Sequence, residues 1–374
     1  MADALKDFFS PAMARRLAAS VAAVHPPFDA KRFVADATKG LTELELKARA
    51  LHMAVALRAH LPLDYREALG VLLASLGPKH ATDELEGAGM APFFYMPHVT
   101  FVAEYGLDAF DASMEAQHAL TQRFTAEFSV RPFIERDPER ALAFLARWAR
   151  DPNPHVRRLV SEGTRPRLPW ASRVRFVDEE PARFVALLET LKDDPNTMVR
   201  RSVANHLNDL TKSQADLALE VAARWLKGAT AERRKLVEHA LRWSVKQGNA
   251  EALALLGFGE KPRVRVTDAS FAPSRVPIGK SVRVTFNVVA KRGGAAQRLA
   301  VDLAVHFVKA RGARSAKVFK VAKLDLAPNE GATLSKTISL AVHTTRKPNV
   351  GEHEVVALVN GAAFPLGAFV VVRR

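Results

Sequence analysis

Apolar side chains recur at helical spacing along the first two thirds of the chain. The segments 43–61, 138–151, 181–194 and 213–228 carry apolar residues three or four positions apart, and each ends near a turn signal such as Asp-Pro or Gly. This spacing places the apolar residues on one face of a helix. The pattern therefore predicts that residues 1–257 form an all-α region.

An internal repeat underlies this helical pattern. Asp151 begins DPNPHVRRLVSEG and Asp194 begins DPNTMVRRSVANHL, so that seven residues match at a spacing of 43 residues. A weaker third copy, ERRKLVEHAL, places Arg234 where Arg200 lies. Asp-Pro before a helix, with Val-Arg one turn later, is typical of HEAT-like repeats. Because one helix pair cannot bury its apolar face alone, we expect a stacked solenoid, an α/α superhelix with a concave face.

Beyond residue 257 the apolar pattern changes toward alternation, which is typical of strands. The predicted strands are 264–271, 281–290, 299–310, 316–326, 332–342, 353–361 and 363–374, with turn signals between them. About seven short strands in a segment of this length predict a small all-β, immunoglobulin-like sandwich. We therefore expect two domains, a HEAT-like helical repeat domain at 1–257 and the sandwich at 258–374.

The net charge of +15 is concentrated in the predicted sandwich. Residues 258–374 hold 20 Lys and Arg against 7 Asp and Glu, whereas residues 1–257 hold 35 against 33. A strongly basic domain indicates a polyanionic partner, most commonly nucleic acid. The simpler alternative is a basic surface that has no partner.

Several kinds of site are excluded or disfavoured by composition and spacing. The chain has no cysteine, so disulfides, thiolate metal sites and cysteine nucleophiles are excluded. The histidines lack zinc-ligand spacing, PIGKS at 277–281 lacks the first glycine of a phosphate loop, and no Gly-x-Ser-x-Gly motif occurs. We expect no metal and no cofactor. The chain has neither an apolar run long enough to span a membrane nor a signal peptide, so we expect a cytoplasmic, nucleoid-associated monomer without a membrane partner.

Three acidic residues occupy related repeat positions. Alignment on Arg-x-x-x-Glu places Glu127 opposite Glu162, and the 43-residue period carries Glu162 onto Asn205. Asp209 lies four residues later, on the same helical face. Neighbouring helices would therefore direct Glu127, Glu162 and Asp209 toward one side, where clustered carboxylates would stabilise a positively charged transition state. The alternative for each acid is a structural ion pair with an arginine of the next repeat.

Arginines and one tryptophan surround these acids and are candidates for binding phosphates and bases. The segment SEGTRPRLPW (161–170) interrupts a helix with a glycine and two prolines, which a purely structural repeat has little reason to contain. Its tryptophan is either a site residue or a core residue. The candidate nucleic-acid-binding residues are Arg157, Arg158, Arg165, Arg167, Arg173, Arg200, Arg201 and Trp170.

The residues 131–170 and the segment DDPNTMVRRSVANHLNDLTK resemble the AlkC branch of the AlkC/AlkD DNA glycosylases. The segments LKDFFSP, LELKARA and YMPHVTFVAEYGLDAF also resemble that family, so that the likeness spans essentially residues 1–257. The predicted sandwich is similar to the immunoglobulin-like domain that one AlkC subgroup carries. The resemblance then covers the whole chain.

The resemblance implies a monofunctional DNA glycosylase of base excision repair. Such a hydrolase removes cationic alkylated bases, chiefly 3-methyladenine and 3-methylcytosine, from double-stranded DNA and leaves an abasic site. Members of the family are thought to kink the duplex without flipping the base fully into a pocket. The family's acidic cluster falls on Glu127, Glu162 and Asp209, as catalytic residues. We expect Glu162 and Asp209 nearest the sugar, with Glu127 supporting them.

Two other functions remain as alternatives. The first is a non-catalytic HEAT-repeat binder of damaged or branched DNA, and the second is a HEAT-type scaffold for protein interactions. The enzymatic interpretation requires the three acids to converge where a sugar cation would form. Acids buried against their own arginines would favour the DNA binder instead.

Overall fold

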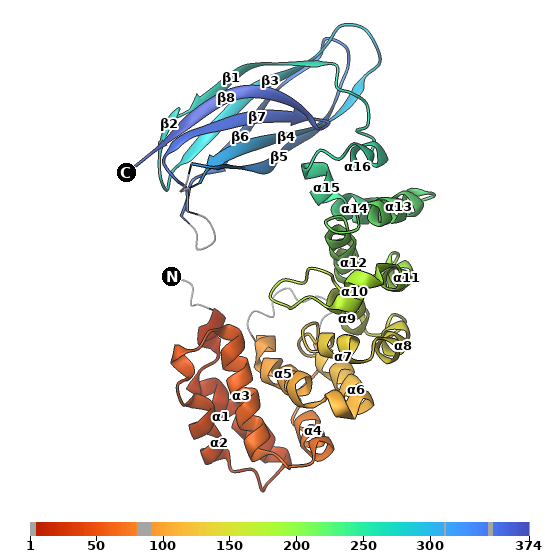
Figure 1. The fold of residues 1–374 in the computed structure, drawn as a ribbon, viewed down its shortest axis with the longest axis vertical. Coiled ribbons are helices and arrows are strands. Elements are labelled where there is room, and N and C mark those ends of the chain that lie inside the picture. The colour runs from red at the N-terminus through yellow and green to blue at the C-terminus, as the bar shows by residue number, and fades with distance from the viewer. Residues whose placement is uncertain (1–4, 81–90, 310–311, 343–346, 374) are drawn as a thin grey trace. The chain divides into compact units, whose positions relative to one another are not determined.

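The computed structural model describes residues 5–80, 91–309, 312–342 and 347–373 (Figure 1). The chain divides into two compact units. One comprises Met1–Ser213 with Thr230–Ala240, and the other comprises Gln214–Ala229 with Leu241–Arg374. The domain boundary expected between residues 257 and 258 stays a prediction.

The first unit consists of helices that pack on their neighbours in the chain, such as α1 on α2, and on helices two or three places further along, such as α9 on α12. The helical region predicted for the first two thirds of the chain is therefore confirmed. Its α-helices are α1 (Pro11–Val24), α2 (Ala30–Thr38), α3 (Leu46–His60), α4 (Tyr65–Ala74), α5 (Met96–Tyr105), α6 (Phe110–Thr121), α7 (Arg131–Arg136), α8 (Pro138–Trp148), α9 (Pro154–Gly163), α10 (Arg175–Glu179), α11 (Pro181–Leu191), α12 (Thr197–Leu210) and α14 (Ala231–Ala240). Short 3-10 helices lie at η1 (Leu5–Phe8), η2 (Leu41–Glu43), η3 (Ala91–Tyr95) and η4 (Leu107–Ala109).

The sequence repeat corresponds to the helix pairs α8–α9 and α11–α12. In both pairs the Asp-Pro-Asn turn starts the second helix in the same way. Asn153 accepts a hydrogen bond from the backbone N–H of His155 at 2.9 Å, and Asn196 accepts one from that of Met198 at 2.8 Å. These side-chain acceptors satisfy backbone donors that have no partner inside the helix. The repeated turn is therefore a repeated helix cap.

The repeated arginines close the same turns. Arg157 donates from Nη1 to the carbonyl oxygens of Asp151 and Pro152 at 2.8 and 3.0 Å. Arg200 binds the corresponding carbonyls of the next repeat, and Arg157 also holds the carboxylate of Asp194 through Nε at 2.6 Å and Nη2 at 2.9 Å. Each turn is thus stabilised from within, and Arg157 links one repeat to the next.

The described residues of the second unit form three helices and a sandwich of two sheets, whose strand pairs are antiparallel except for the edge pair β2–β8. The helices are α13 (Ala215–Leu226), α15 (Arg242–Lys246) and α16 (Ala250–Leu255). The strands are β1 (Val264–Ala272), β2 (Arg275–Pro277), β3 (Ser281–Ala290), β4 (Gln297–Val308), β5 (Arg314–Leu326), β6 (Gly331–Ser339), β7 (Gly351–Val359) and β8 (Ala362–Val372). One sheet has the order β1-β3-β6, and the other has the order β2-β8-β7-β4-β5.

The sandwich core follows from the alternating pattern of its strands. Phe286 of β3, Leu303 of β4 and Phe369 of β8 are fully buried and belong to one cluster, together with valines of the same strands. Each of the seven predicted strands is present, which confirms the immunoglobulin-like fold expected from the sequence. The three-residue strand β2 was not predicted, because it is too short to display a period.

The cap of α12 gives a direct test of the repeated turn. We expect Asn196→Ala to lower the free energy of unfolding of the first unit by about 1 kcal/mol, because it removes the acceptor for the backbone N–H of Met198. Chemical denaturation followed by circular dichroism measures this loss. Asn196→Asp keeps an oxygen acceptor and is the matched control. An equal loss in both variants would contradict the capping role.

Candidate functional site

The three predicted acids lie close together on successive elements of the first unit. Glu127 is in the turn between α6 and α7, Glu162 is in the last turn of α9, and Asp209 is in the last turn of α12. Arginines connect them in sequence. Arg158 lies between Glu127 and Glu162, and Arg165 lies between Glu162 and Asp209. The result is one network in which positive and negative groups alternate.

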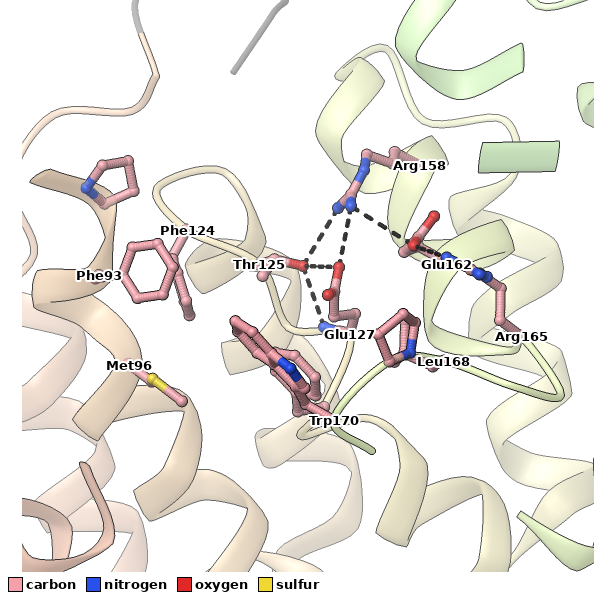
Figure 2. A pocket seen from close by; sticks show the side chains of 13 residues that line it. Phe93, Met96, Phe124, Thr125, Glu127, Arg158, Glu162, Arg165, Leu168 and Trp170 are labelled. Atoms are coloured by element: carbon pink, nitrogen blue, oxygen red, sulfur yellow. Dashed lines mark hydrogen bonds and ion pairs between the residues drawn. The ribbon is translucent and has the colours of Figure 1, made fainter. Parts of the chain in front are cut away.

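Glu127 is held by one of its two carboxylate oxygens. Its Oε2 accepts hydrogen bonds from Thr125 Oγ1 at 2.9 Å and from Arg158 Nη2 at 3.0 Å (Figure 2). Among the described residues, no group donates a hydrogen bond to Oε1 of Glu127. This carboxylate therefore retains an acceptor oxygen for a further ligand.

Glu162 is bound through both oxygens and is 6% exposed. Its Oε1 accepts from Arg165 Nη1 at 2.6 Å, and its Oε2 accepts from Ser202 Oγ at 2.6 Å. Ser161 Oγ donates in turn to Ser202 Oγ at 2.7 Å, so a chain of hydroxyls joins α9 to α12 behind the carboxylate. The side chain is therefore fixed in one orientation.

The arginines keep Glu162 ionised. Burial raises the pKa of this carboxyl, because a charge loses its hydration in the protein interior. The charges of Arg158 and Arg165, with the hydrogen bonds from Ser202 and Arg165, lower it by more, so the pKa lies below the usual value of 4.5. Glu162 is therefore an anion at neutral pH in a site with little water.

Asp209 lies deeper than the other two acids, with 1% of its surface exposed. Its Oδ2 accepts from Arg165 Nε at 2.9 Å, and its Oδ1 accepts from Lys212 Nζ at 3.1 Å. The neighbouring His206 is fully buried, and this burial lowers the pKa of its imidazole to about 4. The ring is therefore neutral at physiological pH and adds no positive charge to the network.

A cavity of about 320 Å³ adjoins the network (Figure 2). Glu127 and Glu162 border it, whereas Asp209 does not. The rest of the wall combines aromatic and apolar side chains with the two arginines. The lining residues are Pro92, Phe93, Met96, Phe124, Thr125, Glu127, Phe128, Arg158, Glu162, Arg165, Leu168, Pro169 and Trp170. An apolar wall beside fixed carboxylates suits a flat cationic ligand.

Trp170 is a surface residue of the cavity wall and not a core residue. It is 58% exposed, whereas Trp148 and Trp225 are each 1% exposed. The helix break predicted for 161–170 is present, because α9 ends at Gly163. Phe93, Met96, Phe124 and Phe128 were not predicted. The two phenylalanines that flank Glu127 in the sequence could have been suspected, but no spacing connects η3 and α5 to the acids.

The other predicted arginines have diverse surroundings. Arg157 and Arg200 bind backbone carbonyls of their own repeat turns, and Arg173 pairs with Asp178 at 2.7 Å. Arg167 and Arg201 are exposed, and neither makes an ion pair with any residue that the structure describes. A role in binding DNA stays a prediction for all of them.

No group of three or more acidic or histidine side chains within the described ranges is arranged to hold a metal ion. In the same ranges, every helix is too short or too polar to cross a membrane.

Three comparisons place the chain among known proteins. Residues 265–373 match the family described as "Uncharacterised protein YhaZ, C-terminal Ig-like domain". YhaZ of Bacillus subtilis (strain 168) is 34% identical over 362 residues, which are 96% of this chain and 97% of YhaZ. The solved structure of the Pseudomonas fluorescens alkylpurine DNA glycosylase AlkC, bound to DNA containing an abasic site analog, is 36% identical. The match covers 99% of this chain and 100% of that chain, with a TM-score of 0.89.

This chain belongs to the AlkC family. The resemblance that the helical segments carried in the sequence is thereby confirmed, as is the immunoglobulin-like domain of an AlkC subgroup.

Stability at low pH tests the ionised state of Glu162. We expect Glu162→Gln to destabilise the first unit by about 3 kcal/mol at neutral pH, because it removes the buried carboxylate that Arg158 and Arg165 share and leaves each guanidinium with one acidic partner instead of two. A carboxyl whose folded pKa is lowered contributes fully above its unfolded pKa and loses that contribution as the pH falls through the folded pKa. The difference between wild type and variant should therefore be constant down to about pH 5 and narrow below it. Urea denaturation at several pH values measures this difference. A difference that does not change with pH would show that Glu162 is not ionised.

Proposed function

We propose that this protein is a DNA glycosylase that hydrolyses the N-glycosidic bond of cationic alkylated bases and leaves an abasic site. The substrates proposed are 3-methyladenine and 3-methylcytosine in double-stranded DNA. One observation carries the proposal: Glu127 and Glu162, joined to Asp209 through two arginines, border an aromatic cavity. The AlkC protein of P. fluorescens, which shares this fold over its whole length, was captured on DNA with an abasic site analog.

Cleavage of this glycosidic bond requires fixed anions near the sugar more than it requires a strong acid to protonate the leaving base. Alkylation at N3 gives the base a positive charge, so the base leaves as a neutral molecule when the C1′–N bond breaks and takes the bonding electron pair. The sugar is left with oxocarbenium character. Water then attacks C1′ and loses a proton. Anionic groups that are already oriented stabilise the charge on the sugar without rearranging during the reaction.

The hydrogen bonds favour roles for the three acids that differ from the roles expected from the sequence. Glu127 has an oxygen without a hydrogen-bond donor among the described residues, so we assign it to orient the water and accept its proton. Each oxygen of Glu162 already accepts a hydrogen bond, so we assign this carboxylate to supply negative charge beside the sugar. Asp209 lies outside the cavity and holds Arg165 in place.

The aromatic wall completes the proposed site. Trp170, Phe93 and Phe124 surround the cavity, and aromatic faces attract cations by their quadrupole. A positively charged base or sugar would therefore meet a favourable surface, whereas a neutral base would gain less from it. This difference would contribute to selection of alkylated over normal bases.

The second candidate is a non-catalytic binder of damaged or branched DNA. The ion pairs favour it, because each of the three carboxylates already has a cationic partner. Release of a free base separates the two candidates. A binder retains affinity for the altered DNA but leaves the glycosidic bond intact.

Base release from defined DNA tests the enzymatic proposal. Purified protein is incubated with duplexes containing 3-methylcytosine or 3-methyladenine, and chromatography detects the free base. We expect release by the wild type and a loss of roughly 100- to 1,000-fold in Glu127→Gln, because one oriented polar group at a reacting centre contributes about that much. Glu139→Gln, which alters an exposed carboxylate on α8 that pairs with Arg183, is the matched control and should keep full activity. Intact DNA after long incubation with the wild type would leave the binder as the function.

Salt dependence of DNA binding tests the exposed arginine of α12. We expect Arg201→Gln to weaken binding to all sequences alike and to reduce the slope of log affinity against log salt by about one, as for the loss of one phosphate contact. Arg147→Gln alters an arginine that already pairs with Glu115 and is the control. An unchanged slope in Arg201→Gln would remove Arg201 from the DNA-binding surface.

A further inference from the structure

The segment between α9 and α10 forms one wall of the cavity but has little regular structure of its own. It begins after Gly163, the last residue of α9, and ends before Arg175, the first residue of α10. Arg165, Leu168 and Trp170 of this segment all border the cavity. Pro166 and Pro169 lack backbone N–H donors, so the segment cannot stabilise itself as a helix would. Its position must therefore be set by groups outside it.

Arg131, the first residue of α7, binds both ends of this segment. Its Nη1 donates to the carbonyl oxygens of Gly163 and Arg165 at 2.8 and 2.9 Å. Its Nε and Nη2 donate to the carbonyl oxygen of Ser172 at 3.1 and 2.8 Å. The guanidinium is 3% exposed, so these bonds compete little with water.

The partners of Arg131 are carbonyl dipoles and not a carboxylate. Within the described residues, no acidic group lies within ion-pair distance of this guanidinium. Burial lowers the pKa of Arg131 to about 10, which still leaves it charged at neutral pH. A planar guanidinium can donate to three carbonyls in fixed directions, and the single ammonium of lysine cannot reproduce this fork.

The tip of the segment is attached as well. Lys47 of α3 donates from Nζ to the carbonyl oxygen of Trp170 at 2.8 Å. Trp170 has φ of 66°, in the left-handed region that residues with a side chain rarely adopt. Such a conformation persists where surrounding contacts impose it. The anchors at both ends and at the tip therefore hold the indole ring at the cavity.

We propose that Arg131 is a positioning residue that fixes the segment 164–174, and through it Arg165 and Trp170, at the cavity. The expected effect of Arg131 on base release rests on the proposed function. Its expected effect on the position of the segment does not rest on that function. Without the fork of Arg131, the segment is free to leave the cavity wall. Arg165 then loses its fixed place between Glu162 and Asp209.

Trypsin cleavage tests the structural part without any activity measurement. The exposed bonds after Arg167 and Arg173 are trypsin sites, whereas the bond after Arg165 precedes proline and is resistant. We expect Arg131→Gln and Arg131→Lys to speed cleavage at these two bonds at least tenfold, as mass spectrometry of the fragments would report. Neither variant creates a new cleavage site, because Pro132 follows position 131.

The matched control is Arg49→Gln. Arg49 is also buried and also binds backbone carbonyls, those of Leu44, Lys6 and Thr42 among them, but it lies outside the cavity lining. We expect this variant to lower the melting temperature without accelerating cleavage after Arg167 and Arg173. Equal cleavage in wild type, Arg131→Lys and Arg131→Gln would overturn the proposal, as would the same acceleration in Arg49→Gln.

Single-turnover kinetics complete the test. We expect Arg131→Lys to slow base release more than tenfold while its affinity for undamaged DNA changes less than threefold. Arg131→Gln and Trp170→Ala should be non-additive, because both act through the same segment. Additive losses would overturn the proposal. If the wild type releases no base, the proposed function fails, and the trypsin result still decides the role of Arg131.

Discussion

The site depends on the ion pairs that two arginine side chains make with three carboxylates. A carboxylate that is as deeply buried as Glu162 would normally take up a proton, because it loses its hydration. Arg158 and Arg165 prevent this by lying between the acids. The same pairing orients each carboxylate, so the negative charge of Glu162 at the cavity has a fixed direction. Such a site provides a fixed electrostatic field beside Glu127, the carboxylate proposed to accept the proton of the water.

The repeats make this alternation possible because they pack the equivalent helices α9 and α12 against each other. α9 and α12 begin with the same capped turn, and Arg157 ties the first turn to the second through Asp194. Any residue near the end of α9 is therefore brought beside the end of α12. The hydroxyl chain from Ser161 to Ser202 and the bridge from Arg165 to Asp209 both use this proximity. The contacts that stabilise the packing of α9 on α12 thus also set the geometry of the site.

The sequence predicted the fold, and its repeat also indicated that Glu162 and Asp209 would lie near each other, because both inferences follow from periodicity. The 43-residue period carries Glu162 to the region of Asp209, and alternation in the sandwich marks the buried side of each strand. The depth at which each acid is buried was not predictable from periodicity. Whether Asp209 reaches the cavity depends on the side chain of Arg165, which belongs to an irregular segment with no period.

The arginines that were predicted to bind DNA show the same limit of prediction from sequence. Arg157 and Arg200 were expected to bind DNA because they lie near the acids in the sequence. Their side chains hold backbone carbonyls of the repeated turns, and a role in binding DNA stays a prediction. A repeated charge is equally compatible with a repeated internal contact, and composition cannot separate the two. Phe93 and Met96 reach the cavity from η3 and α5 through tertiary packing alone. Sequence spacing carries no information on such packing.

The connection between Glu162 and α12 also has a consequence for synthesis. The ribosome delivers Glu127 first, then Glu162 with Arg165, and Asp209 last. Until α12 has emerged and packed on α9, Glu162 lacks the hydroxyl of Ser202 and Arg165 lacks its second carboxylate. A nascent chain therefore contains most of the aromatic wall before it contains a charge arrangement that can act on DNA. The complete network therefore requires the packing of α12 on α9.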